Sequence, residues 1–274
     1  TGAPKGAELT HFNMFFNAYL ASREIVRCTP EDVFLAVLPL FHSFGQTCVM
    51  NAAILSGAAV TMLPRFETGK ALEVIARDRV TVLAMVPTMY FFLLSMQNWA
   101  DYDLSGVRIA ISGGAALPEE VHHQFRERYG ITLQEGYGLS ETSPVASFTV
   151  AEEEVRVGSI GRPVWGVEMG VKLDDGGLAA AGETGEIVIR GHNVMKGYLN
   201  NPKATASAIV DGWFHTGDIG RQDADGFFYI LDRKKDLIIR GGMNIYPREI
   251  EEVLYQHPAV REASVVGIPD RIRG

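Results

Sequence analysis

Two charged side chains late in the sequence could bind a polar ligand together. Asp218 stands in a glycine-flanked turn, and a single carboxylate can accept hydrogen bonds from two hydroxyl groups. Arg233 follows within a densely charged junction at residues 232–236. A fold alone does not require this order of residues, so we interpret Asp218 and Arg233 as a pair that holds the sugar of a nucleotide.

The residues after this pair suggest a hinge and a second binding site. We interpret the charged junction as the hinge. The glycine pair Gly241 and Gly242 has no side chains, so its backbone can approach a second ligand closely. A helix is predicted to begin at Pro247, because proline is favoured in the first turn of a helix.

Lys5 and His42 are two further candidates for ligand binding. Lys5 lies in the turn TGAPKG at residues 1–6, where free N–H groups and a cation could face a phosphate. The alternative is an ordinary turn ahead of a helix, for which Thr10 is a good N-cap. His42 lies between aromatic residues at a predicted strand end and could line a ligand pocket. The alternative there is a partly buried, hydrogen-bonded histidine.

Two glycine-containing loops follow predicted strands. Residues 112–117 open a helix, and the start of such a helix can bind an anion. Residues 136–144 follow the next strand, and no helix is predicted after them. Because ligands on parallel sheets bind beyond the carboxyl ends of the strands, both loops are expected on one side of the sheet.

The order of predicted elements indicates an α/β fold with a β-rich addition. Strands and helices alternate through residues 8–135, which predicts a mostly parallel sheet covered by helices. The first helix is supported by aromatic residues at helical spacing between positions 12 and 20. After about Ser147, short strands indicate a small antiparallel barrel or sheet. From Leu237, a strand, a helix and a strand at residues 263–268 are predicted to open a small α+β unit.

These patterns divide the chain into three parts. Residues 1–147 are assigned to the α/β part of a large domain and residues 148–234 to its β-rich subdomain. Residues 235–274 are assigned to the start of a mobile C-terminal domain. The sequence begins at Thr1 instead of Met and ends just after a strand-like run, so a longer protein is expected.

The composition limits the class of function. The chain has 274 residues, 47% of them hydrophobic, which suffices for one or two domains. A net charge of -8 argues against a nucleic-acid-binding surface, and polyanionic ligands would have to be held by local groups. Cys28 and Cys48 fit no metal spacing and suit a reduced, cytoplasmic setting. No signal peptide is expected, and the given sequence has no apolar run of about 18 residues that could span a membrane.

Four motifs together resemble those of adenylate-forming enzymes, the superfamily of acyl-CoA synthetases, luciferases and peptide-synthetase adenylation domains. TGAPKG looks like the end of the phosphate loop, and EGYGLSE looks like the adenine and phosphate motif. GWFHTGD resembles the ribose motif, and DRKKDLIIRGGMNIYPREIE resembles the hinge motif. The motifs stand in the order typical of the superfamily. The hinge motif is most similar to that of fatty-acyl and aryl CoA ligases.

The resemblance implies a two-step reaction that uses ATP, Mg²⁺ and coenzyme A. A carboxylic acid, expected to be a medium- or long-chain fatty acid, would attack the α-phosphorus of ATP to give an acyl-adenylate and pyrophosphate. The thiol of coenzyme A would then displace AMP. Because a carboxylic acid with a pKa of roughly 4–5 is already ionised, the first step needs positioning and charge neutralisation instead of a general base.

The resemblance also implies roles for individual residues. Ser140 would donate to the α-phosphate, and Glu141 would bind Mg²⁺, a role that suits a carboxylate. His42 would contact the carboxylate of the acid or gate its tunnel. Lys235 would be the pivot of the hinge. Arg240 would pair with a phosphate of coenzyme A, and an ordinary exposed arginine is the alternative.

Further groups of residues are implied in nucleotide and coenzyme A binding. Phosphate contacts are implied for Thr1, Gly2, Lys5 and Gly6. The border between adenine and the acyl group is implied for Gly113, Gly114 and Ala115. Tyr137 would stack on adenine, with Gly136 and Gly138 leaving room for it. Asp218 and Arg233 would hold the ribose, and Gly241 and Gly242 would approach the pantetheine channel.

Several alternatives remain open. The acid could be aromatic, or the acyl group could pass to a carrier protein instead of coenzyme A. A non-catalytic nucleotide-binding relative would be expected to lose Glu141 or Asp218, and both are present. The sequence ends before the motif that carries the adenylation lysine of the superfamily, so this chain alone is expected to form acyl-adenylate poorly. Oligomeric state is not predicted, and a peripheral membrane contact stays open.

Overall fold

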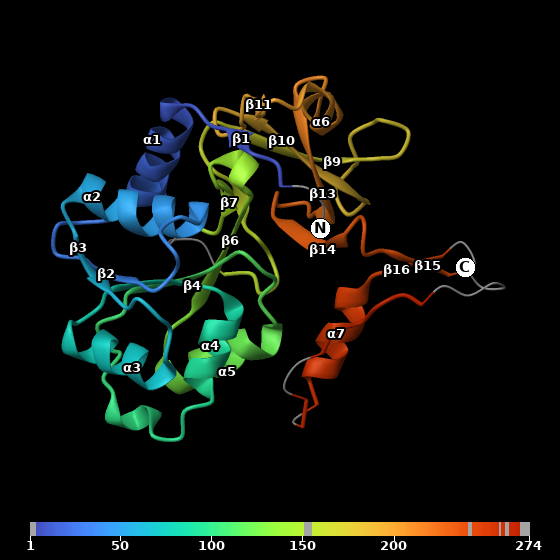
Figure 1. The fold of residues 1–274 in the computed structure, drawn as a ribbon. Coiled ribbons are helices and arrows are strands. Elements are labelled where there is room, and N and C mark those ends of the chain that lie inside the picture. The colour runs from blue at the N-terminus through green and yellow to red at the C-terminus, as the bar shows by residue number, and fades with distance from the viewer. Residues whose placement is uncertain (1–3, 151–154, 241–242, 258, 261–262, 269–274) are drawn as a thin grey trace.

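A seven-stranded sheet forms the centre of the molecule (Figure 1). The structure is a computed structural model that describes residues 4–150, 155–240, 243–257, 259–260 and 263–268. The strand order is β3-β2-β4-β5-β6-β7-β8. The strands are β2 (Val33–Ala36), β3 (Ala59–Met62), β4 (Val82–Met85), β5 (Ile109–Ser112), β6 (Leu133–Gly138), β7 (Val145–Phe148) and β8 (Arg162–Pro163). Strands β2, β3, β4, β5 and β6 run parallel to one another, whereas β7 is antiparallel to β6 and β8 is antiparallel to β7. The predicted mostly parallel sheet is therefore confirmed.

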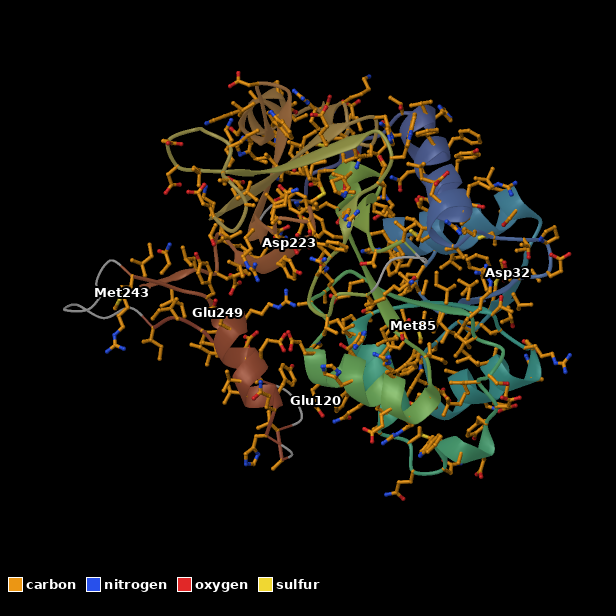
Figure 2. The ribbon with its side chains drawn as sticks, turned by 180° about the vertical axis from the view of Figure 1, so that it is seen from behind. Asp32, Met85, Glu120, Asp223, Met243 and Glu249 are labelled. Carbon is orange, nitrogen blue, oxygen red and sulfur yellow. The ribbon has the colours of Figure 1, made fainter. Side chains whose placement is uncertain are left out.

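Helices cover both faces of this sheet (Figure 1). One face carries α1 (His11–Leu20), η1 (Ala21–Ile25), η2 (Gly45–Asn51) and α2 (Ala52–Ser56). The other carries α3 (Thr68–Arg77), α4 (Pro87–Leu94) and α5 (Glu119–Tyr129). Successive residues of β2 alternate between the two cores: Phe34 packs on the α1 side and Leu35 on the α3 side. Met85, labelled in Figure 2, belongs to the second core. A strand buried on both faces needs the unbroken apolar run that the sequence has.

The first helix begins as predicted but exposes its aromatic side. The hydroxyl of Thr10 accepts the N–H of Asn13 at 3.0 Å, and Asn13 Oδ1 accepts the N–H of Thr10 at 2.7 Å, which forms a capping box. Phe12 and Phe15 keep 58% and 56% of their surface accessible. The buried side instead carries Asn17, whose amide bonds the backbone of Val145 in both directions. Helical spacing of the aromatic residues therefore predicts the helix but not its buried side.

The β-rich part is a five-stranded antiparallel sheet, which confirms the predicted change of architecture. Its order is β12-β13-β10-β9, with β14 paired to β13. The strands are β9 (Val167–Lys172), β10 (Thr184–Gly191), β12 (Ile209–Val210), β13 (Trp213–Gln222) and β14 (Phe228–Arg233). Helix α6 (Pro202–Ala208) is capped by the side chain of Asn201. The start of the chain joins this part, because β1 (Ala7–Glu8) pairs with β11 (Gly197–Tyr198).

Asp218 lies within strand β13 and not in a turn, which corrects the prediction from sequence. His215 pairs with Val188 and Ile219 pairs with Glu186, so three residues of β13 lie opposite one residue of β10. Such a bulge re-aims side chains out of the regular alternation of a strand. Gly217 at its centre has φ +74, a value that favours glycine. The flanking glycine predicted from the sequence therefore serves a bulge.

The C-terminal segment contains β15 (Ile238–Arg240), β16 (Met243–Ile245) and α7 (Pro247–Tyr255). The predicted helix from Pro247 is confirmed, whereas the strand predicted at residues 263–268 is wrong, because these residues form no regular element. The N–H of Val265 instead donates to the Glu251 carboxylate at 2.8 Å. Among the described residues, no helix has the length and apolar character needed to cross a membrane.

Candidate functional site

Two cavities meet at the carboxyl ends of β5 and β6. One has a volume of about 340 Å³ and is lined by charged groups, including Asp218, Arg233 and Arg248. The other has a volume of about 160 Å³ and is lined mainly by apolar side chains. The two cavities share part of their lining, which consists of Gly114, Gly136, Tyr137, Gly138 and Leu139. The two glycine loops therefore lie together on one side of the sheet, as expected, and form a common wall between the cavities.

The glycines of this wall are required by the neighbouring strand β7. A Cβ atom on Gly136 would lie 2.8 Å from the ring of Phe148, and one on Gly138 would lie 1.8 Å from the carbonyl oxygen of Pro144. These distances are too short for any side chain. The resemblance explains both glycines by room for adenine. The structure adds a second cause, which is close packing of β6 against residues 144–148.

The polar cavity is built around the buried carboxylate of Asp218. Tyr137 donates its hydroxyl to Oδ2 at 2.5 Å, and Arg233 donates Nη1–H to Oδ1 at 2.7 Å. Asp218 is only 4% exposed. Burial and then the adjacent carboxylate hold the pKa of Tyr137 well above its ordinary value, so the hydroxyl remains a donor. The structure thus brings Tyr137 to Asp218 and Arg233, which the sequence analysis had already named as a pair.

Glu186 fixes the bulge that carries Asp218. Its carboxylate accepts the N–H of Gly217 at 3.0 Å and an N–H of Lys234 at 3.1 Å. The hydroxyl of Thr216 donates to the carbonyl of Ile187 at 2.7 Å and accepts the N–H of Asp218 at 3.0 Å. Glu186 was not predicted from the sequence. Nothing near position 186 indicates which residue of β13 pairs with it.

A second acidic site lies in η4 (Ser140–Thr142), just after the wall. The hydroxyl of Tyr198 donates to Oε1 of Glu141 at 2.7 Å. The ammonium group of Lys5 lies 4.4 Å from the centre of the same tyrosine ring. Lys5, a predicted phosphate contact, and Glu141, a predicted metal contact, thus contact the same residue. Tyr198 was not predicted from the sequence, and we call the group of Lys5, Glu141 and Tyr198 the corner beside the wall.

The apolar cavity opens beside this corner. His42 and Ser43 line it, and Oγ of Ser43 lies 3.4 Å from Oγ of Ser140. His42 Nδ1 accepts the N–H of Phe44 at 3.2 Å. Its other aromatic neighbour, Phe41, is 92% exposed and does not flank the cavity. The apolar part of the lining includes Ala21, Ile25, Val26, Cys48, Ile111, Val145 and Phe148. No Asp, Glu, Lys or Arg side chain is among the described residues that line this cavity.

Glu135 and Arg248 line the polar cavity but were not predicted from the sequence. Burial raises the pKa of Glu135 from 4.5 to about 7, although nearby Arg248 acts to lower it. Arg248 belongs to α7 and donates Nη1–H to the carbonyl of Ile230 at 2.8 Å. Its own N–H donates to Asp232 at 3.1 Å. These contacts attach the C-terminal helix to the rim of the polar cavity.

The other predicted residues differ in their distance from the cavities. Gly113 lines the apolar cavity and Ala115 the polar one, as the resemblance implies. Lys235 is exposed in the turn after β14, and Arg240 is exposed at the end of β15. Arg240 lines neither of the two cavities. The remaining predicted contacts fall outside the described residues, and these are Thr1, Gly2, Gly241 and Gly242.

The carboxylate of Glu141 is the candidate ligand for a metal ion. Within the described part of the chain, no cluster of three or more His, Cys, Asp or Glu residues could hold a metal by itself. Glu141 offers a single carboxylate beside the cation Lys5. Mg²⁺ is commonly bound by one or two carboxylates together with phosphate oxygens of a substrate. The site therefore fits Mg²⁺ that arrives with a nucleotide.

Comparison with known families and proteins gives consistent matches. The model of the AMP-binding enzyme family matches residues 1–199, and that of the AMP-binding enzyme C-terminal domain matches residues 249–274. A long-chain-fatty-acid–CoA ligase of Bacillus subtilis is 45% identical over 277 aligned residues, covering 100% of this chain and 49% of that protein. A feruloyl-CoA synthase of an Amycolatopsis species is 39% identical, covering 98% of this chain and 55% of that protein.

Solved structures agree with these matches. The crystal structure of ATP-bound MatB from Rhodopseudomonas palustris superimposes with a TM-score of 0.93 at 35% identity. The match covers 100% of this chain and 54% of that one. The chain thus spans about half the length of the relatives that it matches.

Proposed function

The chain belongs to the AMP-binding enzyme family, and from this premise we propose that the whole protein is an ATP-dependent acyl-CoA ligase. It joins a carboxylic acid to coenzyme A through an acyl-adenylate, with pyrophosphate and AMP as products. The observation that carries the proposal is the pair of cavities with a common wall, one charged and one apolar. A reaction between a nucleotide and an apolar acid needs such neighbouring cavities.

In this proposal the polar cavity holds the nucleoside. Asp218 already accepts one internal hydrogen bond at each oxygen, but a carboxylate has about four lone-pair positions. Each oxygen can therefore accept a ribose hydroxyl while its internal donor stays in place. Tyr137 presents its ring to adenine, and Gly114 and Ala115 border the base.

The corner beside the wall holds the phosphates. Ser140 donates to the α-phosphate, and Lys5 neutralises charge on the outer phosphates. Mg²⁺, when bound, neutralises charge on the transferring group, and Glu141 is the residue that would hold it. His42 and Ser43 orient the carboxylate of the acid at the mouth of the apolar cavity. The residues thus act by position and charge, with no proton transfer required.

We propose a medium- or long-chain fatty acid as the substrate. The uncharged lining that includes Ile25, Cys48 and Phe148 suits an alkyl chain, because burial of apolar surface favours binding. An aromatic acid would also suit an uncharged lining, so the choice between the two rests on experiment. Both cysteines are unpaired and buried, which agrees with the proposed reduced, cytoplasmic setting.

The second step is proposed to follow a rotation of the C-terminal domain about Lys235. A few residues at the end of an element commonly absorb such a rotation. Lys235 lies in an exposed turn between β14 and β15. Arg240, which lines neither cavity here, would then approach a phosphate of coenzyme A.

The proposal is tested by release of pyrophosphate from the whole protein with ATP, Mg²⁺ and single acids. The panel comprises linear acids of increasing length, cinnamic acids and a sulfonated acid, each with and without coenzyme A. Release with linear acids and a thioester product in the presence of coenzyme A is the expected result. A cinnamic acid as the best substrate would change the proposed acid. Adenylation without transfer to free coenzyme A would indicate a carrier protein, and ATP binding without release for any acid would overturn the proposed activity.

A further inference from the structure

Tyr198 lies where three segments from distant parts of the sequence meet. Ala7 of β1 pairs with Tyr198 of β11, and the N–H of Leu199 donates to the carbonyl of Gly6 at 2.8 Å. The N–H of Met195 donates to the carbonyl of Glu141 at 2.8 Å. Backbone hydrogen bonds therefore fix the segment of Tyr198 against both the start of the chain and η4.

The side chain of Tyr198 contacts one group of each charge. Its hydroxyl donates to Oε1 of Glu141 at 2.7 Å, and its ring faces the ammonium of Lys5 at 4.4 Å from the centroid. A hydrogen bond to a carboxylate and a cation over an aromatic face are both stabilising contacts.

This arrangement keeps Lys5 and Glu141 available for a ligand. Lys5 lies over the ring of Tyr198 and Glu141 accepts from its hydroxyl, and among the described ion pairs none joins Lys5 to Glu141. Oε2 of Glu141 receives no hydrogen bond from any residue that the structure describes. The tyrosine thus occupies one carboxylate oxygen and leaves the other free, and it attracts the lysine without using a hydrogen-bond acceptor.

The backbone of Tyr198 is held by α6. The backbone N–H of Tyr198 donates to Oγ1 of Thr205 at 2.8 Å, and that hydroxyl donates to the carbonyl of Asn201 at 3.0 Å. A Cβ atom on Gly197 would lie 2.7 Å from Cγ2 of Thr205, so only glycine allows this close packing. Tyr198 is 7% exposed. Its orientation is therefore set before any ligand binds.

We propose that Tyr198 is a positioning residue, which holds Glu141 for Mg²⁺ and Lys5 for the phosphates of ATP. The inference rests on the proposed function, since it concerns the same site. Tyr198 lies in none of the four motifs that carry the resemblance to adenylate-forming enzymes. It acts through Glu141 and Lys5 and does not itself contact the reacting atoms.

The direct test is binding of Mn²⁺ in the presence of ATP, with no acid added, measured by electron paramagnetic resonance on the whole protein. Tyr198→Phe removes the hydroxyl and keeps the ring. We expect about tenfold weaker Mn²⁺ binding, because a hydrogen bond to a charged acceptor is stronger than one between neutral groups. Tyr229→Phe is the matched control, since its hydroxyl donates to Asp223 at 3.2 Å outside the site. The control should bind Mn²⁺ like the wild type.

A double-mutant cycle separates positioning from a general loss of structure. In a Glu141→Gln background, Tyr198→Phe should no longer weaken Mn²⁺ binding, because the carboxylate that it orients is gone. Thermal unfolding of each variant verifies that it is folded. Unchanged Mn²⁺ binding in folded Tyr198→Phe would overturn the inference, as would an equal loss in both backgrounds.

The outcome is independent of the proposed ligase activity. If the wild type binds Mn²⁺ with ATP but releases pyrophosphate with no acid, the proposed function fails while the titration still decides the role of Tyr198. If the protein is active, Tyr198→Phe should also require about tenfold more Mg²⁺ for half-maximal rate. An unchanged Mg²⁺ requirement would contradict the inference.

Discussion

The polar and apolar cavities share one wall but are built in opposite ways. On the polar side, Asp218, Tyr137 and Arg233 come from separate strands and are hydrogen-bonded to one another before any ligand arrives. On the apolar side, Ile25 and Cys48 belong to the hydrophobic core and also line the cavity. A polar network fails when one atom is removed, whereas an apolar cavity changes gradually with volume. Substitutions on the two sides should therefore differ in size and in kind.

The largest effect is expected for Asp218→Ala. The change leaves the Tyr137 hydroxyl and the Arg233 guanidinium without their shared acceptor and removes the proposed partner of the ribose. We expect the rate of adenylation at low ATP to fall on the order of 100-fold or more. Pyrophosphate release at varied ATP measures it, and the ranking of acids should stay unchanged.

Asp223→Ala is the matched control for this substitution. Asp223, labelled in Figure 2, accepts hydrogen bonds from Arg156 at 2.7 Å and from the hydroxyl of Tyr229 at 3.2 Å, but it lines neither cavity. It should lower the stability of the fold and leave the response to ATP near that of the wild type. If both variants lost the same activity, loss of a carboxylate network anywhere, and not the polar cavity, would explain the effect.

The sequence predicted the wall and the charged residues that lie in recognisable local patterns. The loop at Gly136 and the acids Glu141 and Asp218 were found because each lies in a short stretch of unusual composition. The alternation of strands and helices placed both glycine loops on one side of the sheet, and the structure agrees. Patterns of this kind depend on residues that are close together along the chain.

The residues that support the site were missed because their partners are distant in sequence. Tyr198 contacts Glu141, and Glu186 holds the bulge at Gly217, only through the register of paired strands. Similarly, Arg248 reaches the polar cavity because α7 packs beside β14. The predicted strand at residues 263–268 failed for a related reason, since an apolar run forms a strand only where another strand can pair with it.

The next effect concerns pH, to which the two sides should respond differently. Burial raises the pKa of Glu135 from 4.5 to about 7. Between these values the folded protein keeps a proton that the unfolded chain loses, so the free energy of unfolding should fall as pH rises from about 4.5 to about 7. The full loss is on the order of 3 kcal/mol. Burial raises the pKa of Cys48, on the apolar side, to about 12, so it does not titrate in this range.

Glu135→Gln tests this difference. The neutral amide should flatten the fall in stability between about pH 4.5 and 7, which urea unfolding at both ends of the window measures. Exposed Glu127→Gln on α5 is the control and should keep the wild-type slope. Arg248 and Glu252 also face Glu135, so Arg248→Met should raise the pKa of Glu135 further by removing the nearby cation and should extend the fall in stability above pH 7. A wild-type slope in Glu135→Gln would show that another group is responsible.

A smaller and graded effect is expected on the apolar side. Cys48→Leu adds volume to the lining and Cys48→Ala removes it. The preferred acid should become shorter in the first variant and longer in the second, with changes of about tenfold between neighbouring sizes of acid. Competition between pairs of linear acids measures the shift. The response to ATP should stay within about twofold, and the same ranking of acids in both variants would contradict the assigned cavity.

The smallest effect is expected for Lys234→Met, at the exposed edge of the polar side. Lys234 donates to Glu186 at 3.1 Å, but its side chain is 55% exposed, and exposed ion pairs contribute about 0–1 kcal/mol. Glu186 keeps the N–H of Gly217, so the bulge and Asp218 should stay in place. We expect less than about a twofold change in the response to ATP, and added salt should reduce it further. Lys234 bonds through its backbone N–H to Gly217, the residue before Asp218. A large loss of the response to ATP in Lys234→Met would mean that formal charge determines how much a residue of the polar cavity contributes to ATP binding. A small loss would mean that burial determines which hydrogen bonds ATP binding depends on.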